Sequence, residues 1–104
     1  MLLSTTETIP GRTIKRFFGV VSGGTVRSKH LGRDLLAAIK NLFGGELTGY
    51  TALLQESRED ALARMVAEAE SLGANAVVNV RFSSSAIAQG AAEMFAYGTA
   101  VHVD

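Results

Sequence analysis

The densest group of side chains that could do chemistry lies between residues 27 and 34. It consists of Arg27, Lys29, His30, Arg33 and Asp34. Cationic side chains bind carboxylates and phosphates through charge-assisted hydrogen bonds, so this group could hold a small anionic ligand. The same charges also suit a solvated loop or a contact between subunits, where Arg33 and Asp34 would pair across the contact. We therefore treat these residues as a candidate anion-binding or interface cluster.

Metal chemistry has few donors in this sequence. His30 and His102 are the two histidines, and cysteine is absent. Without cysteine the chain has no disulfides, thiolate metal sites, iron–sulfur clusters or thiol nucleophiles. The histidines fall on different predicted elements, so a site would need Asp34, Asp104 or several copies of the chain around an axis. They are weak metal candidates, and the sequence identifies no cofactor.

The sequence also lacks the groups of residues that are typical of enzyme active sites. Residues 19–25 are rich in glycine and follow a predicted strand, but they lack the lysine and the immediate helix of a phosphate-binding loop. The serines at 83–85 have no histidine assigned nearby, and the acids Glu56, Glu59 and Asp60 cluster on the outward side of a predicted helix. The sequence therefore predicts no catalytic residue, and an enzyme would need residues from two subunits to meet.

Size and charge limit the classes of protein further. The chain has 104 residues, which fits one domain over residues 1–104, and its formal net charge is zero. Binding to nucleic acid needs a basic surplus, so we expect no nucleic-acid partner. No apolar run approaches the roughly 20 residues that cross a bilayer, and the first residues do not resemble a secretory signal. We expect a cytoplasmic protein without a membrane span.

Hydrophobic patterning predicts three strands and two helices. β-Branched and aromatic residues favour a strand over residues 13–22, ended by Gly23 and Gly24, and alternation favours strands over 76–84 and 93–103, joined by a loop. Apolar residues at helical spacing predict a short helix over 34–43 and a long one over 51–72, which Gly73 would end in a left-handed conformation.

This order predicts an α+β subunit of two layers, β-α-β-β. A three-stranded antiparallel sheet would carry one long helix and one short helix on one face. The other face would then expose large apolar side chains, for which we identify Phe17, Val21, Phe95, Tyr97 and Val101 as candidates. A soluble chain of zero net charge would bury such a patch against copies of itself. The sequence therefore predicts a homo-oligomer.

Several motifs in this order resemble the YbjQ-like family, also called UPF0145. They are Ser4-Thr5-Thr6 with Ile9 and Gly11, the segment 19–23, Arg33-Asp34 before a helix that ends at Gly44-Gly45, the segment 72–81, and the segment 97–101. The resemblance covers nearly the whole chain. It implies a dodecin-like subunit in a ring, a pentamer, with extra short strands joining the subunits, and it carries the label "putative heavy-metal-binding". The sequence lacks the cysteines that a soft heavy metal prefers.

The function that the sequence favours is that of a non-enzymatic homo-oligomer whose subunit interfaces bind a small ligand or a partner. Two alternatives remain open. One is a metal-binding protein, as the family label suggests, and the other is an enzyme whose site forms only between subunits.

Overall fold

The structure is a computed structural model, and it describes residues 1–27, 48–88 and 91–104. The described elements are β1 (Leu2–Leu3), β2 (Ile14–Arg27), α2 (Thr48–Ser71), β3 (Ala76–Ala88) and β4 (Ala91–Val103). The α+β class and the β-α-β-β order of the larger elements agree with the prediction. The short helix predicted over 34–43 lies outside the described residues.

The sheet has four strands and is mixed, so the predicted three-stranded antiparallel sheet is wrong. Its strand order is β1-β3-β4-β2, in which β1 runs parallel to β3 and the other pairs are antiparallel. The added strand is formed by Leu2 and Leu3, which lie beside Ala76 and Val77. Two residues are too few to show alternation, which is why the sequence pattern does not reveal this strand.

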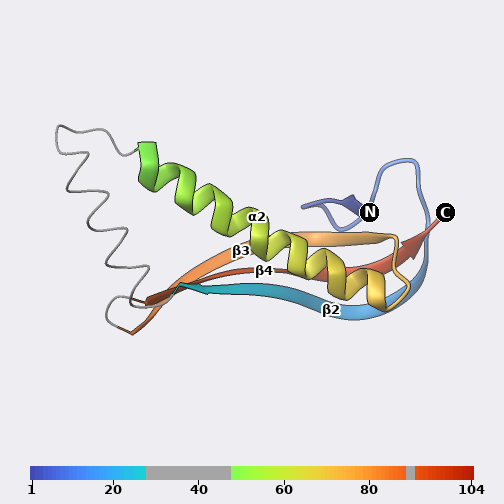
Figure 1. The fold of residues 1–104 in the computed structure, drawn as a ribbon. Helices are drawn as coiled ribbons and strands as arrows, with labels where there is room; N and C mark the ends of the chain where they lie inside the picture. Colours follow the sequence, from blue (N-terminus) through green and yellow to red (C-terminus); the bar gives the residue numbers. More distant parts are fainter. Residues whose placement is uncertain (28–47, 89–90) are drawn as a thin grey trace.

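Helix α2 covers one face of the sheet (Figure 1). Its buried residues Ala61, Met65 and Ala69 recur at i, i+4 and i+8, and they form one core with Val21, Val77, Val80, Ala96 and Ala100 of the strands. Gly73 follows the helix with φ of 91°, as predicted for a left-handed cap. Burial of this stripe holds the helix on the sheet, because helices gain most of their stability from packing.

The three main strands are longer than the sequence predicts. Strand β2 has 14 residues, and β3 and β4 have 13 each, against the five or six of a common strand. Gly23 and Gly24 do not end β2; they pair with Ala96 and Phe95 within it. Much of the predicted loop between the second and third strands is also ladder, because β3 and β4 stay paired up to Ala88 and Ala91. The chain is therefore elongated, with a Cα radius of gyration of 16.6 Å where about 13 Å is expected of a compact domain.

Among the register shifts of the described strands, those at Gly19 and Asn79 decide which side chains in the middle of the sheet face the helix. In β2 the pairing moves from Phe17 with Val101 to Gly19 with Ala100, and Gly19 has a φ of 103°. In β3 a second irregularity includes Asn79, whose φ is 54°. Each bulge adds one residue without a partner and so reverses the in-and-out alternation beyond it.

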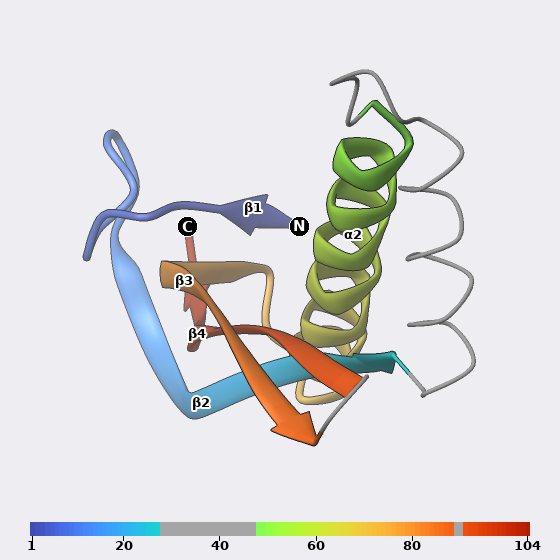
Figure 2. The same ribbon diagram turned by 90° about the vertical axis from the view of Figure 1, so that its left-hand side faces the viewer.

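The N-terminal segment covers part of the sheet face that α2 leaves open (Figure 2). Ile9 packs against a second buried cluster formed by Ala76, Val78, Val101 and Val103. The bulge at Asn79 turns two successive amides toward this segment: the amide of Asn79 donates to the Thr6 carbonyl at 2.9 Å, and that of Val80 donates to the Ser4 carbonyl at 3.0 Å. One end of the second face is therefore closed by the chain itself.

Asn75 ties the start of β3 to the end of β4. Its Nδ2 donates to the carbonyl of Val103 at 2.8 Å, and its Oδ1 accepts the Val103 amide at 2.8 Å. We expect Asn75→Ala to lower the free energy of unfolding by about 2 kcal/mol, because two partly buried backbone groups lose their partner. Urea denaturation measures this loss. Ser71→Ala, which removes an exposed side-chain hydrogen bond to the Glu68 carbonyl, should cost no more than about 0.5 kcal/mol; equal losses would contradict the assignment.

Candidate self-association surface

The sheet face opposite α2 carries an apolar patch beyond the part that the N-terminal segment covers. We call it the outer patch and define it by Phe17, Val20, Phe95 and Tyr97. Phe17 is 74% exposed and Val20 is 75% exposed. On the neighbouring strand β4, the rings of Phe95 and Tyr97 lie on the same face with their centroids 5.9 Å apart. Exposed apolar patches of this kind are typical of protein contact surfaces.

The bulge at Gly19 creates this patch. Phe17 and Val20 are three residues apart, so a regular strand would place them on opposite faces. The extra residue, Phe18, turns toward the helix side, where the Arg16 guanidinium lies 4.9 Å from its ring centroid and where it packs on the core. Sequence reasoning therefore missed Val20. The glycine at position 19 is the available signal, since a left-handed glycine is common in bulges.

Two of the predicted oligomer-facing residues are buried within the single chain, so their assignment to an outer surface is wrong. Val21 lies under α2, because the bulge reverses the alternation of β2. Val101 lies in the cluster that Ile9 covers. Phe17, Phe95 and Tyr97 do lie on the face opposite α2, where the chain's own described residues leave them partly or largely accessible.

A groove runs between α2 and β3 on the opposite side of the sheet. It has a volume of about 380 Å³ and is lined by Gln55, Arg58, Glu59, Leu62 and Phe82. Its apolar floor includes the ring of Phe82, which is 46% exposed. On its rim, Gln55 Nε2 donates to Glu59 Oε1 at 3.4 Å. Arg58 is exposed and borders this groove, whereas the preceding residue, Ser57, is buried.

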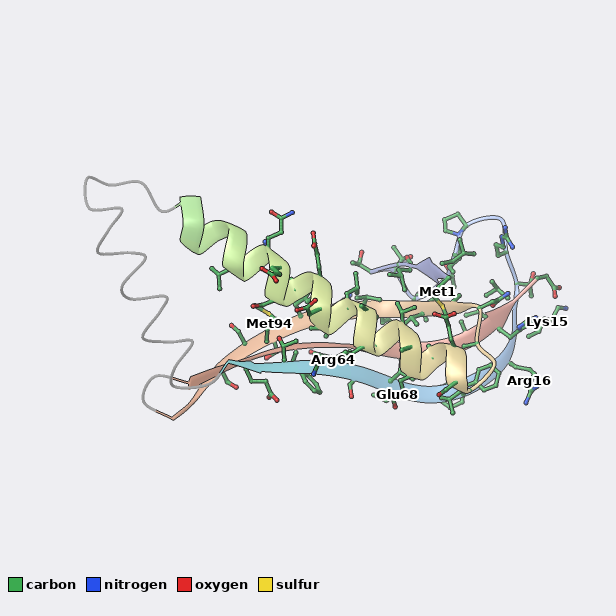
Figure 3. The ribbon with its side chains drawn as sticks, viewed as in Figure 1. Met1, Lys15, Arg16, Arg64, Glu68 and Met94 are labelled. Atoms are coloured by element: carbon green, nitrogen blue, oxygen red, sulfur yellow. The ribbon has the colours of Figure 1, made fainter. Side chains whose placement is uncertain are left out.

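Two charged residues of α2 reach the outer edge of β2. Arg64 Nη1 donates to the carbonyl of Gly24 at 2.8 Å, and the amide of Ser22 donates to Glu68 Oε2 at 3.1 Å. Figure 3 shows both side chains extending from the helix toward this strand. Ser22 and Gly24 lie at the edge of the sheet, where backbone groups have no neighbouring strand in the described chain. The helix thus supplies two of the hydrogen bonds that a further strand would make.

The predicted charged cluster lies almost wholly outside the described residues. Arg27 ends β2, whereas Lys29, His30, Arg33 and Asp34 fall within the segment that is not described. His102 is half-buried on β4, and its Cα partner is Arg16 of β2. Near the same end, Lys15 Nζ lies 3.6 Å from Asp104 Oδ2, in an ion pair that solvent screens. The proposed anion-binding role of the cluster remains a prediction.

The whole sequence, residues 1–104, matches the model of the YbjQ family, which is described as "Putative heavy-metal-binding". The chain belongs to the YbjQ family. Its relatives include a UPF0145 protein of Hahella chejuensis, 60% identical over 101 residues that cover 97% of each chain. Another is a UPF0145 protein of Thermotoga maritima, 58% identical over 104 residues, which cover 100% of this chain and 98% of that one.

A solved structure supports the fold of this YbjQ family member. It is the crystal structure of a protein of unknown function from Pediococcus pentosaceus, described as belonging to the DUF74 family. The two folds superpose with a TM-score of 0.65 over 100% of this chain and 98% of the other, at 16% sequence identity. At such low identity the similarity shows the fold alone.

The metal label of the YbjQ family has no matching donor set in the part of this chain that the structure describes. Among residues 1–27, 48–88 and 91–104, no three His, Cys, Asp or Glu side chains gather closely enough to hold a metal ion. Cysteine, the ligand that soft heavy metals prefer, is absent from the sequence. The described residues therefore do not fit a soft-metal site. In the same ranges, no helix has the length and apolar character needed to cross a membrane.

Proposed function

We propose that this protein functions as a homo-oligomer without catalytic activity of its own, and that its subunits associate through the outer patch. The observation that carries the proposal is the exposure of Phe17 and Val20 side by side on a face that also presents Phe95 and Tyr97. Leaving such side chains in water costs about 25 cal/mol for each Å² of apolar surface, and contact with another copy removes that cost.

The elongated shape of the chain favours the same conclusion. Strands of 13 and 14 residues extend beyond what the 24-residue helix α2 can cover, so the residues that the structure describes leave part of their sheet open. Symmetric closed assemblies are the usual way in which identical chains cover such faces. We propose a ring, and the family resemblance favours five copies.

The ligand-binding part of the proposal rests on the groove beside Phe82. Its apolar floor and its polar rim, which includes Arg58, suit a small molecule with an apolar body and an anionic group. If the groove adjoins a subunit contact, a ligand there would be held between copies. A metal-binding function finds no support in the donors of the described residues.

The experiment that tests this proposal is native mass spectrometry of the freshly purified protein. We expect one discrete oligomer at micromolar concentration, and any mass beyond a whole multiple of the chain would reveal a bound ligand. A protein that is monomeric under these conditions would overturn the proposal.

A double substitution locates the contact. We expect Phe17→Ser with Val20→Ser to raise the subunit dissociation constant at least about a hundredfold, because each buried side chain contributes about 1.5–3 kcal/mol and each 1.4 kcal/mol is tenfold. Sedimentation velocity over a dilution series measures the change. Leu72→Ser is the matched control, since this residue is also exposed but lies after the helix, away from the outer patch. If the double variant dissociates no more readily than the control, the outer patch is not the contact.

A further inference from the structure

The sheet has two long edges, and they differ in how their backbone groups are satisfied. On the β2 edge, Ser22 and Gly24 are bound by Glu68 and Arg64 of the helix. On the β3 edge, β1 pairs only with Ala76 and Val77, and the N-terminal segment reaches as far as Val80. Beyond that point no strand of the described chain lies beside β3.

The pairing of β4 with β2 and β3 shows which amides and carbonyls of β3 point to its open edge. In an antiparallel ladder, residues alternate between those whose amide and carbonyl point to the neighbouring strand and those whose groups point away. Ser22 and Gly24 point away from β4, so their partners Tyr97 and Phe95 point toward β3. These pair with Arg81 and Ser83. Phe82 and Ser84, which alternate with those two residues, therefore direct their amides and carbonyls to the open edge.

A sheet with two open edges can grow without limit. The β2 edge of one copy and the β3 edge of another differ, so their contact is heterologous, and heterologous contacts repeat into filaments unless the rotation closes a ring. Exposed edge strands are therefore a hazard that proteins block. In this chain the two helix side chains occupy two of the groups that an incoming strand would need, the Ser22 amide and the Gly24 carbonyl.

We propose that Arg64 and Glu68 cap the β2 edge against strand addition by the β3 edge of a second copy of this chain. The cap uses one cation and one anion, four residues apart on α2, and each matches the backbone group that it meets: the guanidinium binds a carbonyl and the carboxylate binds an amide. The inference concerns the sheet edge and does not depend on the outer patch.

The test removes the cap and then blocks the other edge. We expect Arg64→Ala with Glu68→Ala to convert discrete species into large, polydisperse ones, with light scattering at least about tenfold above wild type at matched concentration. Adding Ser84→Pro should restore discrete species. Proline at position 84 removes an outward-pointing amide, so it blocks the β3 edge without breaking a bond to β4.

Control variants distinguish loss of the cap from a change in surface charge and from a loss of folding. Glu70→Ala removes a carboxylate, as Glu68→Ala does, but from an exposed position of α2 that does not reach β2, and it should remain discrete. Glu68→Gln keeps an acceptor oxygen for the Ser22 amide and should also form discrete species. Glu68→Ala alone should form larger, polydisperse species. The single variant carries the test if the double variant does not fold, as circular dichroism will show.

Two results would overturn the inference. One is a folded uncapped variant that stays as discrete as wild type. The other is growth that Ser84→Pro does not reduce, because the contact would then not use the β3 edge. Both outcomes can be read whether the wild-type protein is a monomer or an oligomer, so failure of the proposed function leaves this test intact.

Discussion

Replacing Gly23 with alanine is expected to lower the free energy of unfolding by about 3 kcal/mol or more. A Cβ built at this position would meet the Ala61 carbonyl oxygen and the Met65 amide nitrogen, and it would lie 2.8 Å from Arg64 Cβ. These atoms belong to the helix backbone or to its first side-chain carbon, so no rotamer change can move them away. Inserting a methyl group into a tight contact costs about 1–3 kcal/mol, and more where the backbone must shift.

Thermal unfolding at matched protein concentration measures this effect. A loss of 3 kcal/mol corresponds to a fall of about 12 °C or more in Tm for a chain of this size. Concentration must be fixed because association shifts the apparent stability. Gly24→Ala is the control on the adjacent residue, since its Cβ would meet the ends of two movable side chains, Phe95 at 3.2 Å and Glu93 at 3.3 Å. We expect that variant to stay within about 1 kcal/mol of wild type.

The two variants test why the helix lies so close to β2. If Gly24→Ala destabilises the protein as much as Gly23→Ala, the loss of stability does not depend on the close contact between Gly23 and the helix. The position of the helix also sets the edge cap, because Arg64 and Glu68 reach β2 only when α2 lies against it. A displaced helix should therefore also expose the β2 edge and promote growth beyond discrete species.

The elements of this fold are largely predictable from the sequence. Helix α2 follows from apolar residues at helical spacing and from Gly73, and its observed bounds differ from the prediction by a few residues. Strands β2, β3 and β4 follow from their β-branched and aromatic residues. Each of these signals is local, because it depends on side chains within one element.

The residues of the outer patch are less predictable, because the faces of the strands depend on β-bulges. Gly19 and Asn79 adopt left-handed conformations, and each reverses the alternation that follows it. Glycine and asparagine tolerate this conformation, but most of their occurrences in strands do not mark a bulge, so regular alternation groups Phe17 with Val21 and Phe18 with Val20. The structure instead exposes Phe17 and Val20 and buries Val21.

The remaining unpredicted features of the fold depend on contacts between residues that are far apart in the sequence. Gly23 and Gly24 resemble a turn in sequence, but Gly23 serves the approach of a helix that begins more than 20 residues later. Leu2 and Leu3 become a strand only because the edge of β3 is available beside them. The cap formed by Arg64 and Glu68 joins α2 to β2 across 40 and 46 residues. No local pattern encodes such contacts.

Met65→Ala is expected to lower the free energy of unfolding by about 2–5 kcal/mol. Met65 is the largest fully buried side chain among the described residues, and it lies in the core between α2 and the sheet. Truncation removes its transfer free energy and leaves a cavity that the surrounding residues fill only in part. The backbone of this residue also borders Gly23, so the wall of the cavity cannot collapse by moving the strand much closer.

Chemical denaturation of three variants separates packing from helix propensity. Leu54→Ala changes a large apolar residue of the same helix that is 37% exposed, and it should cost no more than about 1 kcal/mol. Met65→Leu keeps the volume and should cost less than about 1.5 kcal/mol. If Met65→Ala and Leu54→Ala lose equal stability, the helix is not held by the buried stripe, and the close contact at Gly23 would have to hold it alone. We therefore expect Met65→Ala to have a much lower free energy of unfolding than Leu54→Ala or Met65→Leu. Only Met65→Ala leaves a cavity between the helix and the sheet.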